Sequence, residues 1–202
     1  FDTVKFNERY CKKTKKNKSF TDSAAAAICD RLREEERDGA YPWRWWIFLL
    51  CLFSGARPGE ICQMNTKDII QKIDNEPVVP SMVIRADEMK SIKNSTSERV
   101  VPIHPHVLKE GFLEYVRLRE KAHEEKLFSL GKRHPQNGFT QNATKFFSPL
   151  FRGMGLPYTL SDCRHTVETK FHHMEMTDHE RRIAARLTGR AVTVSGIRQS
   201  VT

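Results

Sequence analysis

Cysteine is scarce in this sequence, and its spacing is as informative as its number. The five cysteines are scattered, and no two of them form a Cys-x-x-Cys pair. Disulfide frameworks and zinc knuckles use paired cysteines at short, regular spacings, so neither is indicated. His172 and His173 with Cys163 also lack a recognised metal spacing, and we assign no metal and no cofactor. We expect Cys51, Cys62 and Cys163 to be small buried hydrophobic residues with reduced thiols, because the pattern gives them no catalytic histidine.

Long apolar runs are also missing. The longest extends from Trp45 to Phe53, about half of the roughly 18 residues that a membrane-spanning helix needs. No charged, apolar and small-residue signal sequence opens the chain, so we expect a cytoplasmic protein without membrane contact. The chain begins at Phe1 without a methionine, which suggests that further domains belong to the same protein.

Acidic residues are outnumbered. The 34 lysines and arginines exceed the 25 aspartates and glutamates, and the formal net charge is +9. Such a balance favours a polyanionic partner, with nucleic acid first, although charge alone supports this weakly. Glycine-rich phosphate loops and internal repeats are absent.

Residues 1–18 are strongly basic without apolar periodicity, and predict either a solvated linker or a linker that follows DNA. The candidate DNA-contacting residues in this linker are Lys12, Lys13, Lys15 and Lys16.

The length of 202 residues fits one domain, which we expect to span residues 19–202. Apolar periodicity and capping residues predict seven helices. The expected helical segments are 21–39, 42–54, 57–69, 105–127, 140–155, 159–174 and 177–189. The second helix is apolar nearly all round and should be buried, its tryptophans included. Residues 80–94 and 97–105, joined by the polar turn cluster 93–97, predict two antiparallel strands. The expected fold class is mainly α with a small antiparallel β-sheet.

Arg57 stands at a position suited to an anion. It follows the glycine break after the second helix and precedes Glu60 at the start of the third. Backbone amides point outward at such a start, and a phosphate would complement them. The alternative interpretation is an ordinary ion pair between Arg57 and Glu60.

Two further arginines stand near helix ends, Arg164 early in one helix and Arg190 just after another. Phosphoryl transfer without a metal needs planar cationic donors for the nonbridging oxygens and an acid for the leaving oxygen. Lys90 or Lys93, on the predicted hairpin, could supply that acid. Lysines near hairpin tips are more often solvated edge residues, so neither is chosen by its position alone.

Four stretches, taken in order and spacing, carry a resemblance to a known family. They are "SGARPGEICQM", "IKNSTSERVVPIHPHV", "LSDCRHTVETKF" and "ARLTGR". Together they resemble the arginine, lysine-strand, H-x-x-R-H-T and L-G-H boxes of the tyrosine recombinase (phage integrase) catalytic domain. The resemblance covers nearly everything from about Ser19 onward. It implies DNA cleavage by a tyrosine that forms a 3′-phosphotyrosyl link and frees a 5′-hydroxyl, without metal or nucleotide.

The resemblance also implies residue roles. Arg57 and Arg164 match the two arginines that clamp the scissile phosphate, and Glu60 matches a buried acid that orients the arginine helix. Lys93 aligns with the leaving-group acid, with Lys90 as its rival. Further DNA-contacting candidates are Lys90, Arg99 and His165.

Three departures from the family pattern bear on activity. Ser161 stands where the H-x-x-R histidine is expected, and Arg190 replaces the L-G-H histidine. Serine does not titrate near neutrality, so proton transfer at Ser161 would need water or another base. Arg190 can still donate a hydrogen bond to a phosphoryl oxygen. No tyrosine follows Tyr158. The nucleophile therefore lies beyond Thr202, or the protein is a homologue that does not cleave.

Three functions follow from these observations. The first is a site-specific recombinase or integrase of a phage or other mobile element, acting on double-stranded DNA as a homotetramer. The second is a non-cleaving DNA-binding module derived from the same fold. The third is a helical transcription regulator, which the predicted lysine on the hairpin disfavours.

Overall fold

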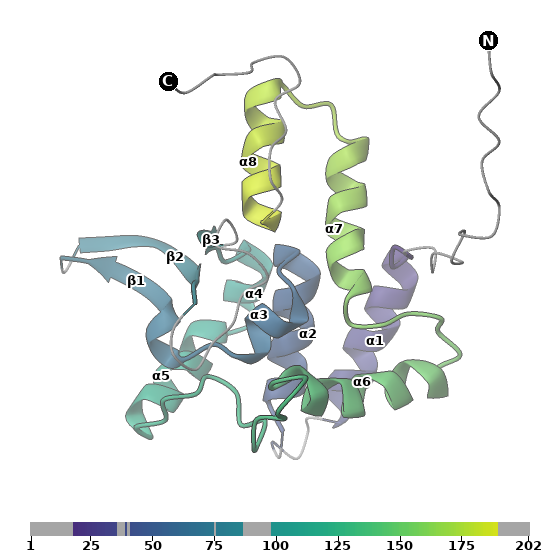
Figure 1. Ribbon diagram of the computed structural model, residues 1–202, viewed down its shortest axis with the longest axis horizontal. Coiled ribbons are helices and arrows are strands. Elements are labelled where there is room, and N and C mark those ends of the chain that lie inside the picture. The colour runs from purple at the N-terminus through teal and green to yellow at the C-terminus, as the bar shows by residue number, and fades with distance from the viewer. Residues whose placement is uncertain (1–17, 36–38, 40, 75, 87–97, 190–202) are drawn as a thin grey trace, which may run out of the picture.

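The computed structural model describes residues 18–35, 39, 41–74, 76–86 and 98–189. Eight α-helices and a three-stranded antiparallel sheet make up this part of the chain (Figure 1). The predicted fold class, mainly helical with a small antiparallel sheet, is confirmed. The elements are α1 (Asp22–Glu35), α2 (Trp43–Ser54), α3 (Pro58–Cys62), a 3₁₀ turn (Thr66–Asp68), β1 (Ile69–Ile73), β2 (Glu76–Ile84), β3 (Arg99–Pro102), α4 (Pro105–Lys109), α5 (Phe112–Lys121), α6 (Thr140–Gly153), α7 (Asp162–His173) and α8 (Asp178–Thr188).

Helix α2 forms the centre of the core, as its composition predicts. Eight of its twelve residues are buried, including all three tryptophans. It packs against α1, α3, α4 and α7. Aromatic rings from other segments surround it, among them Phe20 and Phe151 against Phe48. Trp43, Trp45 and Trp46 are therefore core residues, and the prediction that they serve packing is confirmed.

Gly55 brings three helices close together. It ends α2 in the left-handed conformation, with φ 65°, and its N–H donates to the carbonyl of Cys51. A Cβ atom at this position would lie 3.1 Å from Val167 of α7 and 3.2 Å from Thr188 of α8. Glycine is needed here both for its backbone angle and for its lack of a side chain.

The third helix is much shorter than predicted. It ends at Cys62, and Ile69 begins strand β1, so the expectation of a helix over residues 57–69 is wrong in its second half. The side chain of Asp68 accepts a hydrogen bond from the backbone N–H of Asn65 and stabilises a 3₁₀ turn after α3. Such local side-chain bonds compete with helical hydrogen bonds and end the helix early.

The sheet has one strand more than the sequence indicated. The two predicted strands pair antiparallel, with Met82 of β2 opposite Val101 of β3, and β2 also pairs with the unpredicted β1. In the next helical segment, Gly111 adopts φ 92° and divides the expected single helix into α4 and α5.

Helices α7 and α8 stand beside each other on one side of the body (Figure 1). Thr177 caps α8 by accepting from the N–H of Glu180, and Gly189 ends it in the left-handed conformation, both as predicted. The carboxyl end of α8 points back to the core, where it meets β3 and the turn after α2. Within the part of the chain that the structure describes, no helix is long and apolar enough to cross a membrane.

Candidate phosphate-binding site

Arg57 lies at the turn between α2 and α3, immediately before the first residue of α3. Its backbone N–H donates to Glu60 Oε2 at 2.8 Å, and its Nη1 atom donates to Glu60 Oε1 at 2.9 Å. The ion pair with Glu60, one of the two interpretations of the sequence, is present. The side chain of Arg57 nevertheless remains 29% exposed, so its guanidinium lies at the surface of the site.

Glu60 is buried beneath Arg57. Only 4% of the residue is exposed, and its carboxylate also accepts from Arg99 Nη1 at 3.2 Å and Nη2 at 2.8 Å. Burial opposes ionisation of Glu60, but the hydrogen bonds and charge of Arg99, with the bonds from Arg57, outweigh it and lower its pKa. Glu60 is therefore a buried anion that holds both the backbone N–H and the guanidinium of Arg57.

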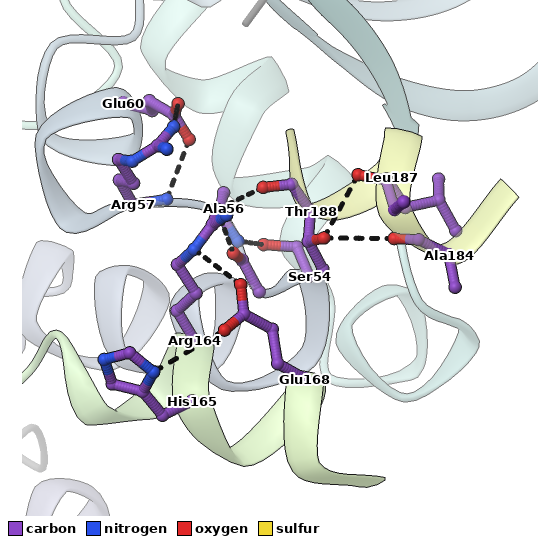
Figure 2. A network of polar contacts seen from close by, with 12 residues as sticks. Ser54, Ala56, Arg57, Glu60, Arg164, His165, Glu168, Ala184, Leu187 and Thr188 are labelled. Carbon is purple, nitrogen blue, oxygen red and sulfur yellow. Dashed lines mark hydrogen bonds and ion pairs between the residues drawn. The ribbon is translucent and has the colours of Figure 1, made fainter. Parts of the chain in front are cut away.

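Arg164 lies in the first turn of α7, and it is 8% exposed. Its Nη1 donates to the carbonyl of Gly55 at 3.2 Å and to the carbonyl of Thr188, and its Nε lies 2.9 Å from Glu168 Oε1 (Figure 2). Burial lowers the pKa of Arg164, Glu168 opposes this effect, and the positive charge of Arg57 adds to it. Arg164 thus joins α7 to the end of α2 and to the end of α8.

The fold brings Arg57 and Arg164 to the same place from distant parts of the sequence. Arg164 binds the carbonyl of Gly55, two residues before Arg57, and the two side chains lie on either side of this turn (Figure 2). With Arg99, the cluster contains three guanidiniums and two carboxylates, Glu60 and Glu168, which leaves one net positive charge. A partly exposed cation over such a cluster attracts an anion.

Ser161 and His165 lie close to Arg164 in the sequence and differ in their surroundings. Ser161 is exposed just before α7, and its backbone carbonyl accepts from the N–H of Arg164. His165 Nδ1 lies 3.5 Å from Glu168 Oε2, so it contacts the same carboxylate that holds Arg164. His165 also lines a hollow of about 430 Å³ between α7 and α8.

Arg99 lies in a different environment from the one predicted for a DNA contact. Its side chain is 7% exposed, and its guanidinium binds the Glu60 carboxylate and the carbonyl of Leu187. All three nitrogen atoms of the Arg99 guanidinium bind these protein acceptors, whereas Arg164 uses Nε and Nη1 for its own, so Arg99 has little left for a DNA phosphate. The structure therefore replaces the predicted DNA contact at Arg99 with an internal role.

Several predicted site residues lie outside the described part of the chain. These are Lys12, Lys13, Lys15, Lys16, Lys90, Lys93 and Arg190. Their assigned roles remain predictions, including the choice between Lys93 and Lys90 as the leaving-group acid.

Sequence reasoning also missed part of the site. Glu168 follows Arg164 by four residues on one helix, and this spacing could have identified the pair. The carbonyls of Gly55, Leu187 and Thr188 carry no side-chain signal, because every residue has a backbone carbonyl.

The cysteines take no part in the site. Cys51, Cys62 and Cys163 are buried, which confirms their prediction as small hydrophobic residues. Burial raises the pKa of the Cys62 thiol to about 12 and also raises those of Cys51 and Cys163, so all three stay protonated. Among the described residues, no group of three His, Cys, Asp or Glu side chains is placed to hold a metal ion.

Comparisons with known proteins add evidence from the fold. No protein-family model and no curated protein matches the chain. Among solved structures, it is similar to the crystal structure of XerA recombinase, with a TM-score of 0.56 and 15% identity over 86% of this chain and 55% of that one. It is also similar to the Tn1549 transposon integrase in complex with transposon right end DNA, with a TM-score of 0.57 and 16% identity over 89% of this chain and 60% of that one.

The fold is that of a tyrosine recombinase catalytic domain. The resemblance first carried by four short sequence stretches is thus confirmed for the fold. The chain spans little more than half the length of either tyrosine recombinase to which it is similar.

Proposed function

We propose that this tyrosine recombinase fold forms the catalytic domain of a site-specific DNA recombinase or integrase. The observation that carries the proposal is the placement of Arg57 and Arg164 on either side of the turn after α2, in a cluster with net positive charge. Two guanidiniums from separate elements suit the nonbridging oxygens of a single DNA phosphate. Arg57, with 29% of its side chain exposed, is the residue that approaching DNA reaches first.

In the proposed reaction, a tyrosine attacks the scissile phosphorus. A bond forms between the phosphorus and the phenolic oxygen, and the bond from phosphorus to the 5′-oxygen breaks. Arg57 and Arg164 stabilise the negative charge of the transition state, and Lys93 donates a proton to the departing 5′-oxygen. Because Ser161 cannot act as a base near neutrality, the phenolic proton passes to water. The reverse steps, with a 5′-hydroxyl of a partner strand as attacker, rejoin the DNA.

The proposal requires a tyrosine from outside residues 1–202, because no tyrosine follows Tyr158 in this sequence. The expected partner is double-stranded DNA, bound by a homotetramer. Similarity to an integrase whose solved structure contains transposon DNA supports this partner. The basic residues 1–18 would follow the DNA backbone outside the active site.

The test is covalent capture of DNA by the natural full-length protein. The protein is incubated with a library of duplexes that carry a nick close to randomised positions, so that a cleaved fragment diffuses away and the adduct accumulates. We expect a protein–DNA adduct that survives detergent, and sequencing of the linked DNA then identifies the site. If the protein selects DNA from the library by binding but forms no adduct, it is instead the non-cleaving DNA-binding module.

A further inference from the structure

We infer that Arg99 is a positioning residue that fixes the carboxyl end of α8 to the Glu60–Arg57 pair. Its guanidinium uses all three nitrogen atoms for this purpose. Nη1 and Nη2 hold the Glu60 carboxylate at 3.2 and 2.8 Å, and Nε donates to the carbonyl of Leu187 at 2.9 Å. One side chain from β3 therefore connects α3 and α8.

The carboxyl end of α8 packs closely against the Arg99 guanidinium. Gly189 ends the helix with φ 66°, and a Cβ atom there would lie 2.7 Å from Arg99 Nη1 and 2.9 Å from Arg99 Cζ. A side chain at residue 189 would thus displace Arg99. The last carbonyls of a helix carry partial negative charge, and a cation placed at them is favourable.

Arg164 holds the neighbouring carbonyl. Its Nη1 donates to Thr188, while Arg99 holds Leu187, so consecutive carbonyls at the end of α8 bind buried guanidiniums from α7 and β3. Both guanidiniums belong to the cluster around Arg57. The position of the last turn of α8 is therefore coupled to the position of the proposed phosphate clamp.

Apolar burial contributes little to holding α8 in place. Thr188 is the only buried residue of this helix. Ile183, one of its two large aliphatic side chains, is 45% exposed. Without a large buried face, the helix depends on its polar anchors more than a core helix does. Loss of Arg99 should then release the end of α8 while leaving the core intact.

This coupling has a consequence for the proposed function, on which it rests. The chain leaves α8 at Gly189 and enters residue 190, the arginine predicted to donate to the phosphate in place of the family histidine. By fixing the last turn of α8, Arg99 sets the position of Gly189, the last described residue, relative to the Glu60–Arg57 pair. Arg99 thereby acts on the reaction through the α8 end and not through the DNA.

Hydrogen exchange of the backbone amides tests the anchor without DNA. Arg99→Met alone would leave the buried Glu60 charge with Arg57 as its remaining cationic partner. The comparison is therefore between Glu60→Gln and the double variant Glu60→Gln with Arg99→Met, so that loss of this charge pairing is common to both. We expect the amides of the last turn of α8 to exchange at least about tenfold faster in the double variant, with α2 unchanged. Arg182→Met, at an exposed arginine in the middle of α8, serves as the control and should leave exchange of the last turn unchanged.

Equal exchange in Glu60→Gln and the double variant would overturn the inference, because Arg99 would then only neutralise Glu60. If the double variant loses protection in α2 as well, Gly189→Ala decides through β3, because the φ of 66° strains the end of α8 in this variant with or without the anchor, while only the crowding of Arg99 reaches β3. Faster exchange in β3 together with the end of α8 supports the anchor, and exchange that is faster at the end of α8 alone refutes it.

Covalent capture then tests the link to cleavage. We expect the full-length double variant to form adduct at least about tenfold more slowly than the full-length Glu60→Gln variant, with similar DNA affinity. Equal rates would refute the positioning role in the reaction. If the wild-type protein forms no adduct, the proposed function fails, and the exchange comparison still decides the anchor.

Discussion

Replacing Arg57 by alanine is expected to slow DNA cleavage by the full-length protein about 10²- to 10³-fold, the size of effect seen when one donor to a developing oxyanion is removed. DNA affinity should change by only about threefold, because one phosphate contact among many contributes a small share of binding. The rate of adduct formation and a binding titration at fixed salt measure the two effects. The fold should survive, because Arg99 continues to hold the buried Glu60 carboxylate.

Arg117→Ala is the matched control for this prediction. Arg117 also pairs with a glutamate three residues away, but it is exposed on α5 and far from the arginine cluster in the chain. Its replacement should change neither cleavage nor binding. Equal losses of binding and cleavage in Arg57→Ala would show that Arg57 is an ordinary DNA-docking residue and would remove it from the proposed chemistry.

Replacing Arg164 by methionine is expected to lower the free energy of unfolding by about 3 kcal/mol, because the change removes a buried charged donor from three acceptors. The carbonyls of Gly55 and Thr188 and the carboxylate of Glu168 all lose a partner. The residue is 8% exposed, so water replaces these bonds poorly. Urea unfolding of the wild type and the variant measures the difference.

Arg181→Met is the control for the stability measurement. Arg181 is exposed on α8 and donates to the carbonyl of Met176, and its loss should cost well under about 1 kcal/mol. The contrast with Arg57 is also informative, because Arg57→Ala should affect cleavage far more than stability. If Arg164→Met unfolds at the same urea concentration as the wild type, Arg164 does not hold α7 and α8 together as the structure indicates.

The sequence was sufficient for the parts of the fold that depend on local patterns. Apolar composition identified α2 as buried, and the caps Thr21 and Thr177 with the stop at Gly189 placed helix ends. The order and spacing of four short sequence motifs indicated the fold that the two similar solved structures share. These features succeed because each depends on a few neighbouring residues.

Features that depend on tertiary contacts were beyond the sequence. Ile69–Ile73 form a strand because β2 lies beside them, and this pairing has no signal within the five residues. Arg99 was assigned to DNA as one of the candidates that accompany the family resemblance. Its actual partners, Glu60 and the carbonyl of Leu187, are brought to it by α3 and α8, and no spacing along the chain shows this.

A crystal structure of the full-length protein on a nicked duplex, with vanadate in place of the scissile phosphate, tests the central claim most directly. We expect guanidinium nitrogens of Arg57 and Arg164 both to lie within hydrogen-bonding distance of oxygens on the same vanadate. Contacts of the two side chains with different phosphates would rule out a shared clamp. A vanadate bound elsewhere, with Arg164 keeping only its bonds to Gly55, Thr188 and Glu168, would rule it out as well.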